Sequence, residues 1–346
     1  MRRWNRMVAG VLAIFLIGSV VITACNAKNE ENEAKQESPP QGQTFKPFST
    51  TSKKVVAEYK GGKITEGDLH LYMNIYSFLD PQFAMIVSDP SLKEKSNEMK
   101  TQLAQELAGQ LYIADKLGGE EKYRKQADQT MVEIEKQLKA APPADGGNPP
   151  KNLDEAIKGK GFTKDQLRNF FIRTSQLNSY FEQKLKDKQF DYVKVNHILV
   201  AVNEGEAQPG QPKRTDAEAK KRADEVKKKL ETGGDFAKLA KEYSDDPGSK
   251  DKGGLIEGSL EEGFFVPQFT NAAKTLPLGK ISDPVKTDYG YHVMKVIERK
   301  KQAIDKAPED VKQELKNRRS TEIFEQLVKN ELQFKSFLPA PKPEKK

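Results

Sequence analysis

The alternation of apolar and polar positions divides the chain into long helical stretches and one block with a strand period. Between residues 53 and 190, apolar residues recur mostly at three- and four-residue steps, which places them on one face of a helix. This spacing predicts long amphipathic helices over about 92–117 and 120–138. The segment 55–64 instead predicts a short strand that ends in a Gly-Gly turn.

Residues 191–300 show a different pattern, with short alternating segments at both ends and two helical patterns and many glycines between them. His197 lies in the first alternating segment, and Val195 shares its face. His292 lies in the last one, and Met294 shares its face. If the two strands are neighbours in one sheet, both imidazoles point to the same side of it.

A further helical pattern begins near Pro308, and its apolar stripe needs a partner. The helices before the block are the natural partner, so the block is interpreted as an insertion into a helical domain. The predicted fold class is α+β, with a small antiparallel-rich sheet and surrounding helices inserted in a mainly helical, chaperone-like domain. That domain is predicted to combine residues 53–190 with a C-terminal helix over 301–338, and a disordered tail follows over 339–346.

The first 24 residues have the features of a secretory signal peptide. Three arginines precede an apolar run over residues 7–22, which at about 16 residues is short for a membrane span of ~20. Residues 22–25, Ile-Thr-Ala-Cys, resemble the bacterial lipobox, and this resemblance implies that Cys25 is lipidated and becomes the first mature residue. An uncleaved anchor, or an ordinary signal peptide with an incidental cysteine, is the alternative.

Residues 26–52 contain no Leu, Ile, Val or Met, so they cannot bury enough apolar surface to offset their ordering entropy. This composition predicts a flexible tether over 25–52. The net charge of +7 falls to +4 without the three arginines of the signal peptide, a modest excess that favours anionic lipid head groups and wall polymers. No basic stripe with interleaved aromatic residues is present, so nucleic acid is not an expected partner.

Six segments within 192–298 together resemble the parvulin family of peptidyl-prolyl cis/trans isomerases. In chain order they are residues 196–199, 235–246, 253–255, 267–269, 278–285 and 287–292. With the lipobox and the flanking helices, the arrangement resembles the PrsA-type foldase lipoproteins of Gram-positive bacteria. The resemblance implies a lipid-anchored enzyme on the outer face of the cell membrane that isomerises X-Pro bonds in newly translocated proteins. It implies no metal and no cofactor, and a homodimer is left open.

The resemblance also assigns roles to individual residues. His197 and His292 match the two facing histidines of the family's active site, and Asp246 matches a position that is cysteine or aspartate in the family. Tyr289 occupies a position often held by a residue with a hydroxyl group. The positions that match the apolar pocket for the proline ring are Leu255, Phe265 and Phe269.

The reaction suits these residue types. Rotation about a peptide bond is opposed by ~18 to 20 kcal/mol, whereas cis and trans X-Pro differ by only ~0.5 to 1 kcal/mol. A catalyst therefore breaks no covalent bond and has only to favour the twisted amide. Because aspartate is a poor substitute for an attacking thiol, Asp246 is interpreted as an electrostatic and hydrogen-bonding group.

Other functions fit parts of the same pattern. The two histidines could bind zinc with Asp246 or Asp288, but no His or Cys spacing typical of zinc sites is present. A Ser-His-Asp hydrolase using Ser244 or Ser249 would lack the usual nucleophile turn. A chaperone whose isomerase fold only binds clients remains open, and a solute-binding lipoprotein would need two α/β lobes that the helical patterns do not offer.

Overall fold

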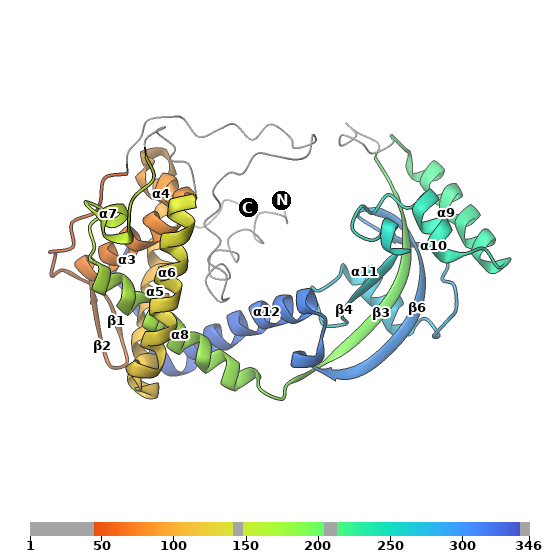
Figure 1. The fold of residues 1–346 in the computed structure, drawn as a ribbon. Coiled ribbons are helices and arrows are strands. Elements are labelled where there is room, and N and C mark those ends of the chain that lie inside the picture. Colours follow the sequence, from red (N-terminus) through yellow and green to blue (C-terminus); the bar gives the residue numbers. More distant parts are fainter. Residues whose placement is uncertain (1–44, 141–147, 204–212, 340–346) are drawn as a thin grey trace. The chain divides into compact units, whose positions relative to one another are not determined.

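The computed structural model describes residues 45–140, 148–203 and 213–339. The predicted signal peptide 1–24, Cys25 and residues 340–346 of the tail lie outside the described residues. The chain divides into two units, the first formed by residues up to 184 and from 317 onward, the second by 185–316 (Figure 1). In the part that the structure describes, no helix has the length and apolar character that a membrane crossing requires.

The first unit is mostly helical, and the two long helices predicted from periodicity are confirmed as α5 and α6. Its helices are α3 (Glu66–Leu79), α4 (Pro81–Ser88), η1 (Pro90–Leu92), α5 (Lys93–Leu117), α6 (Glu120–Ala140), α7 (Leu153–Ile157), α8 (Lys164–Leu185) and the later part of α12 (Glu309–Leu327). Helix α3 begins at a capping box, in which Thr65 and Asp68 satisfy each other's backbone N–H groups. Thr163 and Gln166 make the same reciprocal pair before α8.

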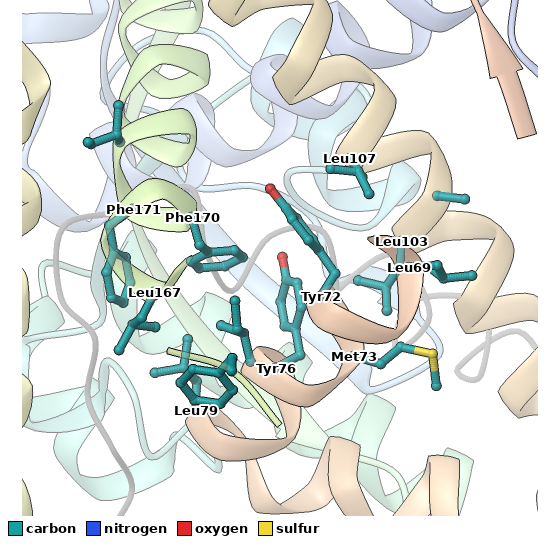
Figure 2. Close-up of a cluster of buried hydrophobic side chains, with 14 of the residues drawn as sticks. Leu69, Tyr72, Met73, Tyr76, Leu79, Leu103, Leu107, Leu167, Phe170 and Phe171 are labelled. Carbon is teal, nitrogen blue, oxygen red and sulfur yellow. The ribbon is translucent and has the colours of Figure 1, made fainter. Parts of the chain in front are cut away.

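Helices α3, α5 and α8 enclose the core of this unit (Figure 2). The rings of Tyr72 and Tyr76 on α3 meet the ring of Phe170 on α8 at 5.3 and 5.4 Å between centroids. Leu103 and Leu107 on α5 are also buried in this cluster. Because each such side chain contributes roughly 1.5 to 3 kcal/mol when buried, the aromatic and leucine contacts hold these helices together.

A three-stranded sheet completes the first unit in the order β2-β1-β7. The predicted strand and Gly-Gly turn are confirmed as β1 (Val55–Tyr59) and β2 (Gly62–Thr65). The third strand, β7 (Lys335–Ser336), pairs antiparallel with β1 and was not predicted. At two residues, β7 is too short to leave a periodic signal in the sequence.

The prediction of one C-terminal helix over 301–338 is therefore corrected. The last long strand extends to Ala303, η3 (Ile304–Lys306) follows, and α12 begins only at Glu309. After α12, the π-helical turn η4 (Val328–Leu332) leads into β7. Residues 298–301 are all charged, so no alternation of apolar and polar positions marks this part of the strand in the sequence.

The predicted tether is also corrected at its C-terminal end. Phe48 donates its backbone N–H to Asn74 Oδ1 at 2.9 Å and packs against the core of the first unit. The Ser52 carbonyl accepts a hydrogen bond from the backbone of Gly67 at 3.1 Å. The composition argument counted aliphatic residues and overlooked Phe45 and Phe48, whose rings lie 5.7 Å apart. Residues 25–44 of the tether lie outside the described residues.

The second unit is a four-stranded antiparallel sheet in the order β4-β3-β6-β5, with helices on both faces. Its elements are β3 (Gln189–Ala201), α9 (Asp216–Glu231), α10 (Phe236–Tyr243), η2 (Lys250–Lys252), β4 (Leu255–Ser259), α11 (Pro267–Thr275), β5 (Val285–Thr287) and β6 (Gly290–Ala303). One face of the sheet packs on α9 and α10, and the other packs on α11. The fold is thus α+β, and in the sequence the unit with the antiparallel sheet is inserted between the two segments of the helical unit.

Candidate functional site

The pairing of β3 with β6 brings the two histidines together. In the register of these antiparallel strands, His197 lies opposite Met294 and Leu199 lies opposite His292. The histidines are therefore diagonal neighbours on one face, with nearly parallel rings 5.5 Å apart between centroids. Their Nδ1 atoms lie 3.3 Å apart, and each residue is only 5% exposed.

Asp246 meets the first histidine from the loop that follows α10. Its Oδ2 atom lies 3.0 Å from His197 Nε2. Ser249 places its Oγ 3.0 Å from the same nitrogen and also donates to Asp246 Oδ2. The backbone N–H of Gly248 donates to the other carboxylate oxygen at 3.1 Å, so both oxygens of Asp246 are held.

The electrostatics of the site fix the charges of two of these groups. The hydrogen bond with His197 holds the pKa of the Asp246 carboxyl well below its ordinary value, and the bond from Ser249 adds to this effect. Burial lowers the pKa of His292 from 6.5 to about 3, and the neighbouring His197 contributes in the same direction. At neutral pH, Asp246 is therefore a carboxylate and His292 a neutral imidazole.

These contacts allow one proton arrangement when both imidazoles are neutral. Since the carboxylate of Asp246 can only accept, His197 carries its proton on Nε2 and donates to Asp246. His197 Nδ1 is then an acceptor, so His292 donates from its own Nδ1 across the 3.3 Å contact. His292 Nε2 accepts from Thr287 Oγ1, which lies 2.9 Å away. A continuous hydrogen-bond chain thus runs from Asp246 to Thr287.

An apolar surface adjoins this polar chain. The ring of Phe269, at the start of α11, stands edge-on to both imidazoles, with centroids 5.6 Å from His197 and 5.4 Å from His292. Phe265 lies beside Phe269 at 5.2 Å and is only partly buried. Val195 and Met294 belong to the same buried cluster. The site therefore combines a rigid polar wall with an aromatic surface.

The structure corrects one expected pocket residue, because Leu255 lies on the wrong face. In the pairing of β3 with β4, Leu255 is opposite Asn196 and Ile256 is opposite Val195. Directly opposed residues share a face, and a shift of one residue reverses it. Ile256, which packs against the cluster that contains Phe269, is therefore the side chain on the histidine face.

The hydroxyl group of Tyr289, which the resemblance assigned to the active site, is not part of the hydrogen-bond chain of the histidines. Its side chain is 46% exposed, and its hydroxyl makes no hydrogen bond with any residue that the structure describes. The hydroxyl that closes the histidine chain belongs to Thr287, which also accepts the backbone N–H of Tyr289 at 3.2 Å. A catalytic role for Tyr289 stays a prediction. The sequence analysis did not predict a role for Thr287, because only the pairing of β5 with β6, in which Thr287 lies opposite Gly290, brings it beside His292.

The geometry argues against a Ser-His-Asp triad. In such a triad the serine and the aspartate contact opposite ring nitrogens, so that the aspartate orients the imidazole. Here Ser249 and Asp246 both contact Nε2 of His197. The Oγ atom of Ser244 accepts hydrogen bonds from the backbone N–H groups of Leu199 and Asp246.

Across residues 45–140, 148–203 and 213–339, no group of three or more His, Cys, Asp or Glu side chains is arranged to hold a metal ion.

Comparison with known proteins identifies similar chains. The family described as PPIC-type PPIASE domain matches residues 180–300. The foldase protein PrsA of Clostridium botulinum (strain 657 / Type Ba4) is 28% identical, over 91% of this chain and 92% of that protein. Foldase protein PrsA 3 of Bacillus anthracis is 32% identical, over 69% of this chain and 78% of its own. A 1.70 Å crystal structure of the peptidylprolyl isomerase PrsA from Bacillus anthracis, 25% identical, covers 65% of this chain and 94% of its own at a TM-score of 0.36.

Proposed function

The chain belongs to the PrsA family of foldases and carries a PPIC-type peptidyl-prolyl isomerase domain, and from this premise we propose where and how it acts. It isomerises X-Pro bonds in proteins that have just crossed the cell membrane, while lipid on Cys25 holds it at the outer face of that membrane. The observation that carries the catalytic part is the fixed chain of Asp246, His197 and His292 beside Phe269.

The aromatic surface binds the proline ring in this proposal. Phe269 lies under the ring, Phe265 borders it on the more exposed side, and Ile256 takes the place first assigned to Leu255. A planar amide has a charge-separated resonance form that water stabilises and an apolar surface does not. Removing water therefore favours the twisted amide, whose carbonyl has ketone character and whose nitrogen regains its lone pair.

The polar wall holds the amide against this surface. Because every member of the chain from Asp246 to Thr287 is hydrogen-bonded at both ends, the groups do not reorganise as the amide turns. Asp246 provides a fixed negative charge at hydrogen-bond distance, 3.0 Å, from His197 Nε2. No covalent bond to the substrate is needed, which agrees with a carboxylate at this position.

The proposed location depends on the N-terminal sequence. The arginine-containing start, the apolar run 7–22 and the Ile-Thr-Ala-Cys segment support lipidation at Cys25. Replacing Cys25 with Ser should release the protein from the membrane fraction into the medium, or leave an unprocessed precursor. Metabolic labelling with a radioactive fatty acid should label the parent chain and not the variant. Equal labelling of both chains would contradict lipidation at Cys25.

One experiment separates catalysis from client binding as the main cellular task. A strain that lacks the native gene would receive either the parent chain or the double variant His197→Ala, His292→Ala, and secretion of a proline-containing exported protein would be measured. The proposal expects the double variant to restore secretion poorly. Full restoration by an isomerase-inactive variant would favour a chaperone that only binds clients.

A further inference from the structure

A buried ion pair lies directly beside the catalytic carboxylate in the sequence and outside the histidine chain. Arg214 Nη1 donates to Asp245 Oδ2 at 2.6 Å, and the two side chains are only 12% and 13% exposed. The same guanidinium nitrogen donates to the carbonyl of Ala201, at the end of β3, at 2.9 Å. Asp245 Oδ2 also accepts the backbone N–H of Ala201 at 2.9 Å. One arginine thus joins the end of a catalytic strand to the residue before Asp246.

Backbone contacts extend this connection to Asp246 itself. The N–H of Asp245 donates to the carbonyl of Leu199 at 2.8 Å, two residues after His197 on β3. Ser244 Oγ accepts the N–H of Leu199 at 3.3 Å and the N–H of Asp246 at 3.2 Å. The segment 244–246 is therefore fastened alongside β3, and its position sets where the Asp246 carboxylate meets His197.

We propose that Arg214 is a positioning residue for the isomerase reaction, acting through Asp245 to hold Asp246 against His197. The inference rests on the proposed catalytic role of Asp246. Without the guanidinium, the Asp245 carboxylate would stay buried with one N–H donor, so the loop would move to hydrate the charge. Such a movement would displace Asp246 and remove the acceptor that fixes the proton of His197 on Nε2. Misplacement by about 1 Å is enough to lower a rate by up to roughly a hundredfold.

The hydrogen bonds of Arg214 distinguish it from the other ion pairs of this unit. Lys227 pairs with Asp283 at 2.8 Å, but Asp283 is exposed and neither residue bonds the segment 244–246. Breaking that pair should affect neither the carboxylate nor the histidines. Lys227 also pairs with Glu231 at 3.4 Å, so Lys227→Met is a control for the loss of exposed ion pairs on the same unit.

The test compares the full chain with Arg214→Met, Arg214→Lys, Lys227→Met and Asp246→Ala. Isomerisation of a short X-Pro peptide would be measured by NMR exchange, together with the nitrogen chemical shifts of the imidazoles. The expected result for Arg214→Met is a loss of about tenfold to a hundredfold in kcat/KM, mainly in kcat, with changed His197 shifts in a folded protein. Arg214→Lys should recover part of the loss because a cation again reaches Asp245. Lys227→Met should behave like the parent.

The outcomes separate the inference from the function on which it rests. Arg214→Met with kcat within twofold of the parent, while Asp246→Ala is inactive, would overturn the positioning role alone. An active Asp246→Ala chain would overturn the proposed role of Asp246. A purely structural arginine would lower the melting temperature and leave the His197 shifts and the kcat of the folded protein unchanged, which also overturns the proposal. If Arg214→Met does not fold, the kcat and the His197 nitrogen shifts of Arg214→Lys test the positioning role instead. Parent values for both would overturn it.

Discussion

The helical unit should lose stability as the pH rises through neutrality, because it buries a carboxyl group at its centre. Glu106 on α5 is 9% exposed and accepts hydrogen bonds from the Tyr76 hydroxyl at 2.6 Å and from Gln110 Nε2 at 3.0 Å. Gln110 in turn accepts from the hydroxyl of Tyr72 at 2.6 Å. Burial raises the pKa of Glu106 from 4.5 to about 7, against the opposing effect of its two donors. Figure 2 shows the two tyrosines side by side in this core.

The sign and size of the effect follow from the two pKa values. The pKa of Glu106 is about 7 in the folded chain and 4.5 in the unfolded chain, so the folded chain binds the proton more tightly. The contribution of this proton to the free energy of unfolding is fully present below about pH 4.5 and is lost as the pH rises through 7. Between pH 5 and pH 8 the loss amounts to about 2 to 3 kcal/mol. Burial raises the pKa of Tyr72 to about 12 and that of Tyr76 well above 10, so neither tyrosine titrates in this range.

Urea unfolding of the full chain, followed by helical circular dichroism at pH 5 and pH 8, measures this effect. Glu106→Gln cannot ionise and should remove most of the dependence, whereas Glu98→Gln, on the same helix with a partly exposed side chain, should retain it. The reasoning is refuted if the parent and Glu106→Gln lose equal stability over this range, or if the parent gains stability at pH 8.

Three further predictions concern the isomerase site. Two-bond nitrogen correlation spectra should show His197 protonated on Nε2 and His292 on Nδ1 at pH 7; the opposite tautomers would contradict the hydrogen-bond chain. Thr287→Val keeps the shape but removes the donor to His292, and should lower kcat by roughly tenfold with little change in KM, measured by peptide exchange. Ile256→Ala should raise KM several-fold while Leu255→Ala leaves it nearly unchanged, and equal effects would show that β4 does not place Ile256 on the histidine face.

Long periodic segments were predictable from the sequence because many residues report the same geometry. The helices α5 and α6 follow from apolar spacing over five or more turns, and the capping box of Thr65 and Asp68 marks where α3 begins. The sequence indicated that both rings would lie on one side if the strands carrying His197 and His292 were neighbours, and the two strands do pair. The shared side follows from the period of two in each strand together with their register.

The errors lie where one residue decides the result. Leu255 and Ile256 are both branched aliphatic residues at the start of an edge strand, so composition cannot say which faces the pocket; only the register with Val195 does. Thr287 was overlooked because a hydroxyl beside a histidine has no signal of its own without the strand pairing. The contact between Arg214 and Asp245 joins residues separated by 31 positions, which no local pattern reveals.

The most direct test of the catalytic site is the isomerisation rate of the full chain after Asp246→Ala. With exchange of a short X-Pro peptide measured by NMR, the account predicts a fall of at least about tenfold in kcat/KM, with circular dichroism unchanged. Asp251→Ala, which removes an exposed carboxylate in η2 between α10 and β4, should keep the parent rate. Turnover by the Asp246→Ala chain equal to that of the parent would contradict the claim that this carboxylate and the paired histidines form the site.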